Sequence, residues 1–194
     1  MPPDVATAVG TSLYVMDDRW DPNCLASALG PQRTTEGIRV RCMFPGARSV
    51  VAVARNDGRQ LAVLTNAGDG SLFEGLLRDA VPYRLEVDWP GSSRLLDDPY
   101  ALPPIADEMD RYLLAEGTHL DLAWRMGSTV LMVEGIAGVR FAVWAPQARQ
   151  LSVVGDFNGW DARRHPLRRL RGATVWELFV PGVTAGCHYR YQVT

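Results

Sequence analysis

The chain has 194 residues, of which 47% are hydrophobic and 22% are charged, and its formal net charge at pH 7 is −2. This length can form one large domain or two small ones, each able to bury its own core. The weakly acidic charge argues against nucleic acid or an anionic membrane as the dominant partner. No apolar run approaches the roughly 18 residues that a bilayer-spanning helix needs.

Cysteine usage and the N-terminus together indicate a compartment. The N-terminal sequence lacks the basic and apolar segments of a signal peptide. Cys24, Cys42 and Cys187 are scattered, odd in number and without metal-ligand spacing. We therefore expect a cytoplasmic protein with buried or free thiols and no disulfide framework.

The histidines do not cluster either. His119, His165 and His188 are not clustered in the sequence. Their spacing therefore builds neither a metal site nor a catalytic triad. We expect neither a metal nor another cofactor.

Two stretches far apart in the chain, 37–53 and 138–154, share one pattern. The matching positions, first stretch before second, are Gly37 and Gly138, Arg39 and Arg140, Pro45 and Pro146, Ala47 and Ala148, and Arg48 and Arg149. The similarity continues beyond them, since Phe73 precedes 83–87 as Trp176 precedes 189–193. A repeat of this length indicates two copies of one domain rather than a solenoid of short units.

Each copy contains short runs rich in β-branched and aromatic residues, separated by turn signals. The sequence therefore predicts an all-β fold of two tandem immunoglobulin-like sandwiches joined by a partly helical linker. We place the first sandwich at 1–104, the linker at 105–135 and the second sandwich at 136–194.

The linker has partial helical spacing over 107–126, and Gly117 would interrupt a long helix. We expect one or two helical turns, packed in the groove between the sandwiches. Its acidic residues Asp107, Glu108 and Asp110 are neighbours on one turn. Glycosidic chemistry needs two carboxylates opposed across a cleft, about 5 to 10 Å apart, so these residues are not a catalytic pair.

A polar aromatic tip, Asp156–Asp161, follows the strand at 151–154 and has no counterpart in the first copy. An aromatic ring can dock on the apolar face of a pyranose, and amide or carboxylate groups can bond its hydroxyls. Trp160 beside Asn158 and Asp161 offers both, which makes the tip a candidate sugar-binding surface. The alternative, equally open from the sequence, is that Trp160 folds back and plugs the end of the sandwich.

Other aromatic and basic residues have simpler explanations. Trp144 and Trp176 lie within strand patterns, so we expect them to be core or half-buried packing. The run 163–171 is rich in arginine and could contact phosphate. Since one aromatic lies nearby and the chain is acidic overall, we expect a solvated loop and strand edge, or a contact to an acidic neighbouring domain.

With these residues in view, nearly the whole chain resembles bacterial 1,4-α-glucan (glycogen) branching enzymes. The stretches 141–146, 154–161, 163–166 and 175–181 are similar to the starch- and glycogen-binding module of that family. The stretches 98–100, 112–113 and 116–119 resemble the linker after its extra N-terminal sandwich. The family's Leu-Gly-x-His stands here as Leu29-Gly30-Pro31-Gln32, which indicates a divergent first sandwich.

The resemblance implies a function. In the family an α-amylase-type catalytic barrel follows these domains, and no motif of that barrel occurs before Thr194, so we expect no enzyme in this chain. The resemblance assigns α-1,4-glucan or glycogen as ligand and the barrel as partner, without nucleic acid or membrane. By position it assigns glucan binding to Trp160, Asn158 and Arg190. The alternative is a structural role, in which the domains brace the barrel or mediate assembly and bind no sugar.

Overall fold

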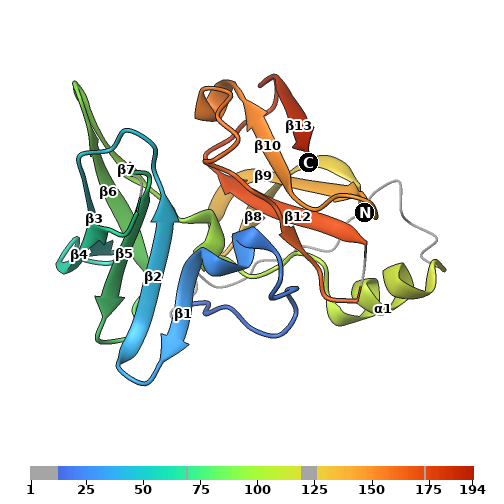
Figure 1. The fold of residues 1–194 in the computed structure, drawn as a ribbon, viewed down its shortest axis with the longest axis horizontal. Coiled ribbons are helices and arrows are strands. Elements are labelled where there is room, and N and C mark those ends of the chain that lie inside the picture. The colour runs from blue at the N-terminus through green and yellow to red at the C-terminus, as the bar shows by residue number, and fades with distance from the viewer. Residues whose placement is uncertain (1–12, 69, 119–125, 173) are drawn as a thin grey trace.

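The fold is all-β, as the sequence predicts, and consists of two strand-built units that lie side by side (Figure 1). This computed structural model describes residues 13–68, 70–118, 126–172 and 174–194. The strands of the first unit are β1 (Gly30–Thr34), β2 (Gly37–Met43), β3 (Ser49–Ala54), β4 (Gln60–Asn66), β5 (Leu72–Leu77), β6 (Tyr83–Trp89) and β7 (Ser92–Leu96). Those of the second are β8 (Gly127–Val133), β9 (Ile136–Trp144), β10 (Leu151–Gly155), β11 (Arg168–Arg169), β12 (Val175–Pro181) and β13 (Tyr189–Val193). The helices are η1 (Leu25–Ala28), η2 (Pro99–Ala101), α1 (Glu108–Glu116) and η3 (Asp156–Asn158).

In the first unit the strands follow the order β1-β2-β5-β4-β3-β6-β7, and all neighbours are antiparallel. Burial alternates along β2 and along most of β6, because successive side chains of a strand point to opposite faces. One face of this sheet therefore supplies a core and the other meets solvent. The buried core residues are Ile38, Val40, Cys42, Val50, Ala52, Leu64, Phe73, Leu77, Tyr83, Leu85 and Val87.

The second unit is built from the sheets β11-β12-β9-β8 and β10-β13, and it repeats the pairings of the first. β9 pairs with β12 as β2 pairs with β5, and β10 pairs with β13 as β3 pairs with β6. Gly37 and Gly138 occupy equivalent places. A Cβ on either would lie 2.5 Å from a carbonyl oxygen, that of Leu77 or of Val180. Close approach of the neighbouring strand therefore explains the glycine that the two stretches share.

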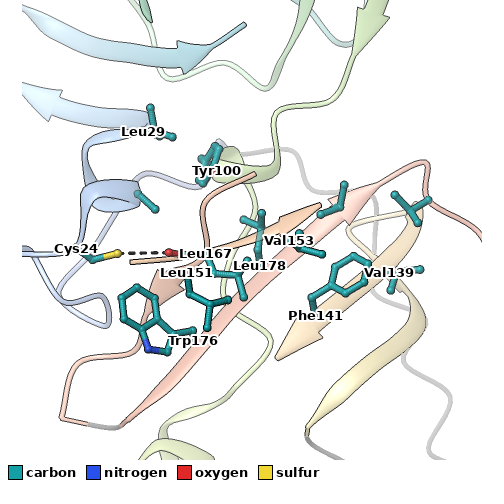
Figure 2. Packing of buried hydrophobic residues seen from close by; sticks show 13 residues of the cluster. Cys24, Leu29, Tyr100, Val139, Phe141, Leu151, Val153, Leu167, Trp176 and Leu178 are labelled. Carbon is teal, nitrogen blue, oxygen red and sulfur yellow. Dashed lines mark hydrogen bonds between the residues drawn. The ribbon is translucent and has the colours of Figure 1, made fainter. Parts of the chain in front are cut away.

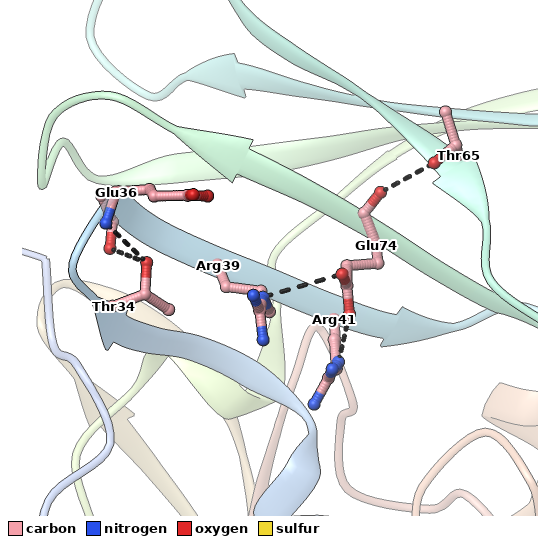
Figure 3. A network of polar contacts seen from close by, with 7 residues as sticks. Thr34, Glu36, Arg39, Arg41, Thr65 and Glu74 are labelled. Atoms are coloured by element: carbon pink, nitrogen blue, oxygen red, sulfur yellow. Dashed lines mark hydrogen bonds and ion pairs between the residues drawn. The ribbon is translucent and has the colours of Figure 1, made fainter.

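An arginine–glutamate pair also occurs in both units, in different surroundings. In the first, the Nε atom of Arg39 lies 3.6 Å from Glu74, and Glu74 also pairs with Arg41 on the outward face of the sheet (Figure 3). In the second, the Nε atom of Arg140 lies 3.2 Å from Glu177, and both side chains are almost fully buried. Burial raises the pKa of the Glu177 carboxyl.

The segment that follows the first unit covers the buried pair of Arg140 and Glu177. The backbone N–H of Ile105 donates to Glu177 Oε1 at 2.7 Å, and Leu114 of α1 packs in a cluster with Trp20 and Val175. The expected helical turns are present, but α1 packs against the second unit rather than in the groove between the two (Figure 1). β8 also lies within the range expected for the linker, and it pairs with β9.

The acidic turn of the linker has a structural role. The Asp107 side chain accepts a hydrogen bond from the Asp110 backbone N–H at 2.7 Å, and the Asp110 side chain accepts one from the Asp107 N–H. This reciprocal capping box starts α1. Gly117, with φ of 73°, ends it.

The N-terminal segment joins the two units into one core. Cys24 and Leu29, together with Tyr100 from η2, pack with buried residues of β9, β10 and β12 (Figure 2). The Tyr100 hydroxyl donates to the Pro166 carbonyl oxygen at 2.8 Å. Residues 19–29, in the range expected for the first sandwich, therefore pack on the second.

Arg168 lies at the centre of this junction and is 1% exposed. Its guanidinium donates to the carbonyl oxygens of Leu29, at 2.6 Å, and Ala26, at 3.4 Å. The rings of Trp20 and Tyr100 lie 5.3 and 5.0 Å from the same group. Among the described residues no carboxylate forms an ion pair with Arg168, and burial lowers its pKa.

The expectation that the arginine run is solvated is wrong at Arg168. The reason is the N-terminal segment, which adds to the edge of β11 and encloses the side chain: the Asp21 N–H donates to the Arg169 carbonyl and the Arg171 N–H to the Arg19 carbonyl. Sequence spacing could not show that a segment far away in the chain covers this edge.

The expectation for Trp144 is also wrong, since its side chain is 64% exposed, whereas Trp176 is 1% exposed as expected. Side chains alternate along β9: Val139 and Phe141 point into the sandwich, and Trp144 falls on the outward side. It lies at the last position of the strand, beyond the part that the linker covers.

Substituting Arg168 with alanine tests the junction. The change leaves two carbonyls without their donor and opens a cavity, so we expect the free energy of unfolding to fall by about 3 kcal/mol. Arg171, which is exposed, is the matched control, and Arg171→Ala should change stability by less than about 0.5 kcal/mol. Urea unfolding followed by circular dichroism measures both. Equal midpoints for the two variants would show that Arg168 does not hold the units together.

Candidate functional site

The polar tip at the end of β10 is a short, internally bonded loop. η3 follows β10 directly, and both Gly159 and Trp160 have left-handed backbone conformations, with φ of 65° and 62°. A left-handed conformation costs a non-glycine residue about 1–2 kcal/mol. The loop must therefore contain contacts that hold Trp160 in this conformation.

Asn158 supplies those contacts and is 1% exposed. Its Oδ1 atom accepts the backbone N–H groups of Gly155, at 2.9 Å, and Trp160, at 3.2 Å. Its Nδ2 atom donates to the Val153 carbonyl at 2.9 Å and lies 2.9 Å from His165 Nδ1. An asparagine amide can make these four bonds, two as acceptor and two as donor, so its capacity is used entirely by the loop and the residues on either side of it.

This bonding fixes the state of His165. Because both amide hydrogens of Asn158 point to acceptors, Nδ1 of His165 must be unprotonated and the imidazole neutral. Burial, reinforced by the nearby Arg164 guanidinium, lowers the pKa of His165 to about 4. No spacing in the sequence signals this pair, and no pattern there points to a role for His165.

Trp160 projects from the loop with 45% of its side chain exposed, so it does not plug the sandwich. The guanidinium of Arg190, which is exposed on β13, lies 5.9 Å from the centre of the Trp160 ring. β10 pairs with β13 so that Val154 lies opposite Arg190. This pairing places Arg190 beside the loop that carries Trp160. A flat apolar ring beside a multiple hydrogen-bond donor is suited to a polyhydroxyl ligand.

A second contact joins the start of the loop to His188, the residue before β13. Asp156 accepts the backbone N–H of His188 at 3.1 Å, and its Oδ2 atom lies 3.2 Å from His188 Nδ1. These bonds, the backbone one foremost, lower the pKa of Asp156. Gly155 permits this approach, since a Cβ there would lie 2.4 Å from the His188 carbonyl oxygen.

The structure thus brings the three residues assigned by resemblance to one corner but gives them different surroundings. Trp160 and Arg190 face solvent together, and Asn158 lies beneath them in the protein.

Within the described ranges no group of histidine, cysteine or carboxylate side chains could hold a metal ion. His119 lies outside those ranges. All three cysteines are free. No described helix is long and apolar enough to cross a membrane.

Two family models match the chain in sequence. Residues 15–100 match the model described as alpha-1,4-glucan branching enzyme GlgB, N-terminal domain. Residues 125–194 match carbohydrate-binding module 48, the isoamylase N-terminal domain. The site described above lies entirely in the second match.

Curated relatives agree with both models. The 1,4-alpha-glucan branching enzyme GlgB of Pseudomonas syringae pv. tomato is 45% identical over 190 residues, which are 97% of this chain and 25% of the relative. GlgB 1 of Xanthomonas campestris pv. campestris is 46% identical over 189 residues, 92% of this chain and 26% of the relative. The chain therefore spans about a quarter of the length of these relatives.

Solved structures are more distant. The crystal structure of apo pullulanase from Klebsiella pneumoniae is 18% identical and covers 79% of this chain and 19% of that one, with a TM-score of 0.31.

The Asn158–His165 contact predicts a pH dependence. The folded-state pKa of His165, about 4, is below its ordinary value of 6.5, so the unfolded chain binds more protons between these values. Stability should therefore be lost as pH falls from 6.5 toward 4, with about 2 kcal/mol of the loss due to this histidine.

The control for this pH dependence is the variant His165→Asn, which keeps an acceptor for the Asn158 amide but cannot titrate. Urea unfolding of both proteins from pH 7 to pH 4.5 separates this histidine from the carboxylates, which both proteins share. Parallel stability curves would mean that His165 is not held neutral by the fold.

Proposed function

The chain belongs to the bacterial 1,4-alpha-glucan branching enzymes, as the N-terminal region of one, and we propose that its part in such an enzyme is to bind α-1,4-glucan without doing the chemistry. The catalysis, cleavage of α-1,4-glucan and transfer of the chain to form α-1,6 branches, we assign to an α-amylase-type barrel elsewhere in the whole enzyme. The two sandwiches hold glucan near that barrel and raise its effective concentration there. We place the enzyme in the cytoplasm, which the three free thiols support.

One observation carries this proposal: Trp160 is presented to solvent by a loop that is strained at that residue and held by a buried, fully bonded amide. A packing tryptophan would not need such a loop. Strain that the surroundings hold in place is typical of binding sites. In this proposal the Trp160 ring stacks on a pyranose, Arg190 donates to its hydroxyls, and Asn158 contributes by positioning the loop rather than by touching sugar.

A second candidate, the structural role, has an observation of its own. The apolar side chains of Val130, Met132 and Val193 are each more than half exposed, on β8 and β13. Exposed apolar residues on strands can mark a surface that another domain covers, here the barrel. In the structural role the domains bind no sugar, so glucan binding by the chain distinguishes the two roles.

Replacing Trp160 with glycine tests the binding role without unfolding the protein. Glycine adopts the left-handed conformation at no cost, so Trp160→Gly removes the ring while relieving the strain. We expect unchanged or slightly higher stability and at least tenfold weaker affinity for glycogen, measured by migration in native gels of graded glycogen content.

The matched control is Trp144→Ala, because Trp144 is the other largely exposed tryptophan of the described chain and lies outside the loop. It should migrate as the wild type does. If Trp160→Gly also migrates as the wild type does, glucan binding by this loop is ruled out and the structural role remains.

Arg190 gives an independent check. It is exposed and its removal leaves no buried group unpaired, so Arg190→Ala should not affect folding. Loss of a charge-assisted hydrogen bond to sugar should weaken glycogen affinity about three- to tenfold. An affinity equal to that of the wild type would remove Arg190 from the site.

A further inference from the structure

A cavity of about 390 Å³ lies between the two units, apart from the exposed Trp160 ring. Its walls come from the corner after β2 and the β6–β7 hairpin on one side. On the other side they come from η3, residues 164–165 and residues 180–183. This volume is within the range of about 300–1,000 Å³ typical of small-molecule sites, which often form at domain interfaces.

The first unit contributes an aromatic wall. Trp89 is half-buried, and its Nε1–H donates to the Pro45 carbonyl at 3.2 Å, which fixes the orientation of the ring. Phe44 meets it edge to face, with ring centres 5.8 Å apart and planes at 87°. Phe157 of η3, also half-buried, lines the cavity from the second unit. The cavity therefore has aromatic surface on both sides.

An arginine of the second unit supplies hydrogen-bonding capacity. The Arg164 guanidinium lies 5.4 Å from the centre of the Trp89 ring. Its Nε–H is buried, and among the described residues it has no hydrogen-bond partner. A buried donor without a partner is unfavourable, and a hydrogen-bond acceptor on a ligand would satisfy it. Arg94, exposed at the rim, adds further donors.

The charges around the cavity indicate the class of ligand. Two arginines, Arg94 and Arg164, and two aspartates, Asp97 and Asp98, line it, so their formal charges cancel. His165 is held neutral by its contact with Asn158. A phosphate or a cation would find no excess of opposite charge. A neutral ring with an apolar face and hydroxyls around its edge matches both the aromatic walls and the mixed donors and acceptors.

We propose that this interdomain cleft is a second α-glucan site, distinct from the Trp160 surface, which takes a pyranose unit between Trp89 and Phe157 with Arg164 as hydrogen-bond donor. The identity of the sugar as α-glucan rests on the proposed function. The connection between β10 and β11 carries Trp160 and also Phe157 and Arg164, so one side of it faces the cleft and the other side faces solvent.

The test follows the indole N–H signals of the tryptophans in a nitrogen-15 NMR titration of the whole chain with maltoheptaose. Single Trp→Phe variants assign the signals of Trp89 and Trp160, and each signal reports its own site. We expect both to shift with saturation. In Trp160→Gly the Trp89 signal should still respond to sugar with unchanged affinity, which is the residual, at least tenfold weaker binding that native gels detect in this variant.

Variants in the cleft complete the test. Arg164→Gln and the exposed Arg94→Ala should weaken the response of Trp89 at least tenfold and threefold, respectively, and leave that of Trp160 intact. Because Arg94 is exposed, its variant stays informative if Arg164→Gln does not fold. Arg171→Gln is the control for loss of an arginine outside both sites, and both responses should remain.

The outcomes separate the two proposals. A Trp160 response without a Trp89 response overturns the cleft site and keeps the proposed function. A Trp89 response that disappears in Trp160→Gly also overturns the cleft site, because the change would then be transmitted from the first site. A Trp89 response without one from Trp160 supports the cleft and contradicts the Trp160 site. No response from either contradicts both.

Discussion

The guanidinium of Arg168, buried with no carboxylate partner in the described part of the chain, holds together three parts of the chain that are far apart in sequence. It bonds the carbonyls at the end of η1, lies over Trp20 and Tyr100, and belongs to β11 of the second unit. Burying a charge is costly unless hydrogen bonds compensate it, and backbone carbonyls do so here. The N-terminal segment and the two sandwiches consequently share one packed junction. The cleft between the units and the loop beside it depend on that junction for their relative positions.

The same balance of cost and compensation operates in the Trp160 loop. A left-handed tryptophan costs about 1–2 kcal/mol, while each of the four Asn158 hydrogen bonds contributes about 1 kcal/mol. The bonds outweigh the strain, so the loop keeps the ring outside the core. Stability is provided by a residue that solvent cannot reach, which leaves Trp160 and Arg190 free for the recognition of glucan that we propose. Residue type alone suggested that Asn158 would touch sugar, whereas its burial is the reason that we propose a positioning role for it.

Much of the fold could be predicted because both copies of the repeat show the same strand patterns. Each copy also keeps a glycine where a neighbouring strand approaches closely. Gly37 and Gly138 marked equivalent strands correctly, and the exposed Trp160 lies where the sequence placed a polar tip. The expectations that were wrong, those for Arg168 and Trp144, depend on which segment of the chain covers which face of a sheet. Arg168 is buried by a distant segment, and Trp144 is exposed because no described element covers the end of its strand. Neither fact is encoded in local spacing.

We propose that glucan binds where a strained backbone and a buried amide present Trp160 to solvent. A crystal structure of the chain soaked in maltoheptaose tests it most directly. We expect a pyranose ring in van der Waals contact with the Trp160 indole, its hydroxyls within hydrogen-bond distance of Arg190, and Asn158 unchanged beneath. Sugar bound elsewhere on the chain at saturating concentration, with the Trp160 ring bare and free of crystal contacts, would contradict it.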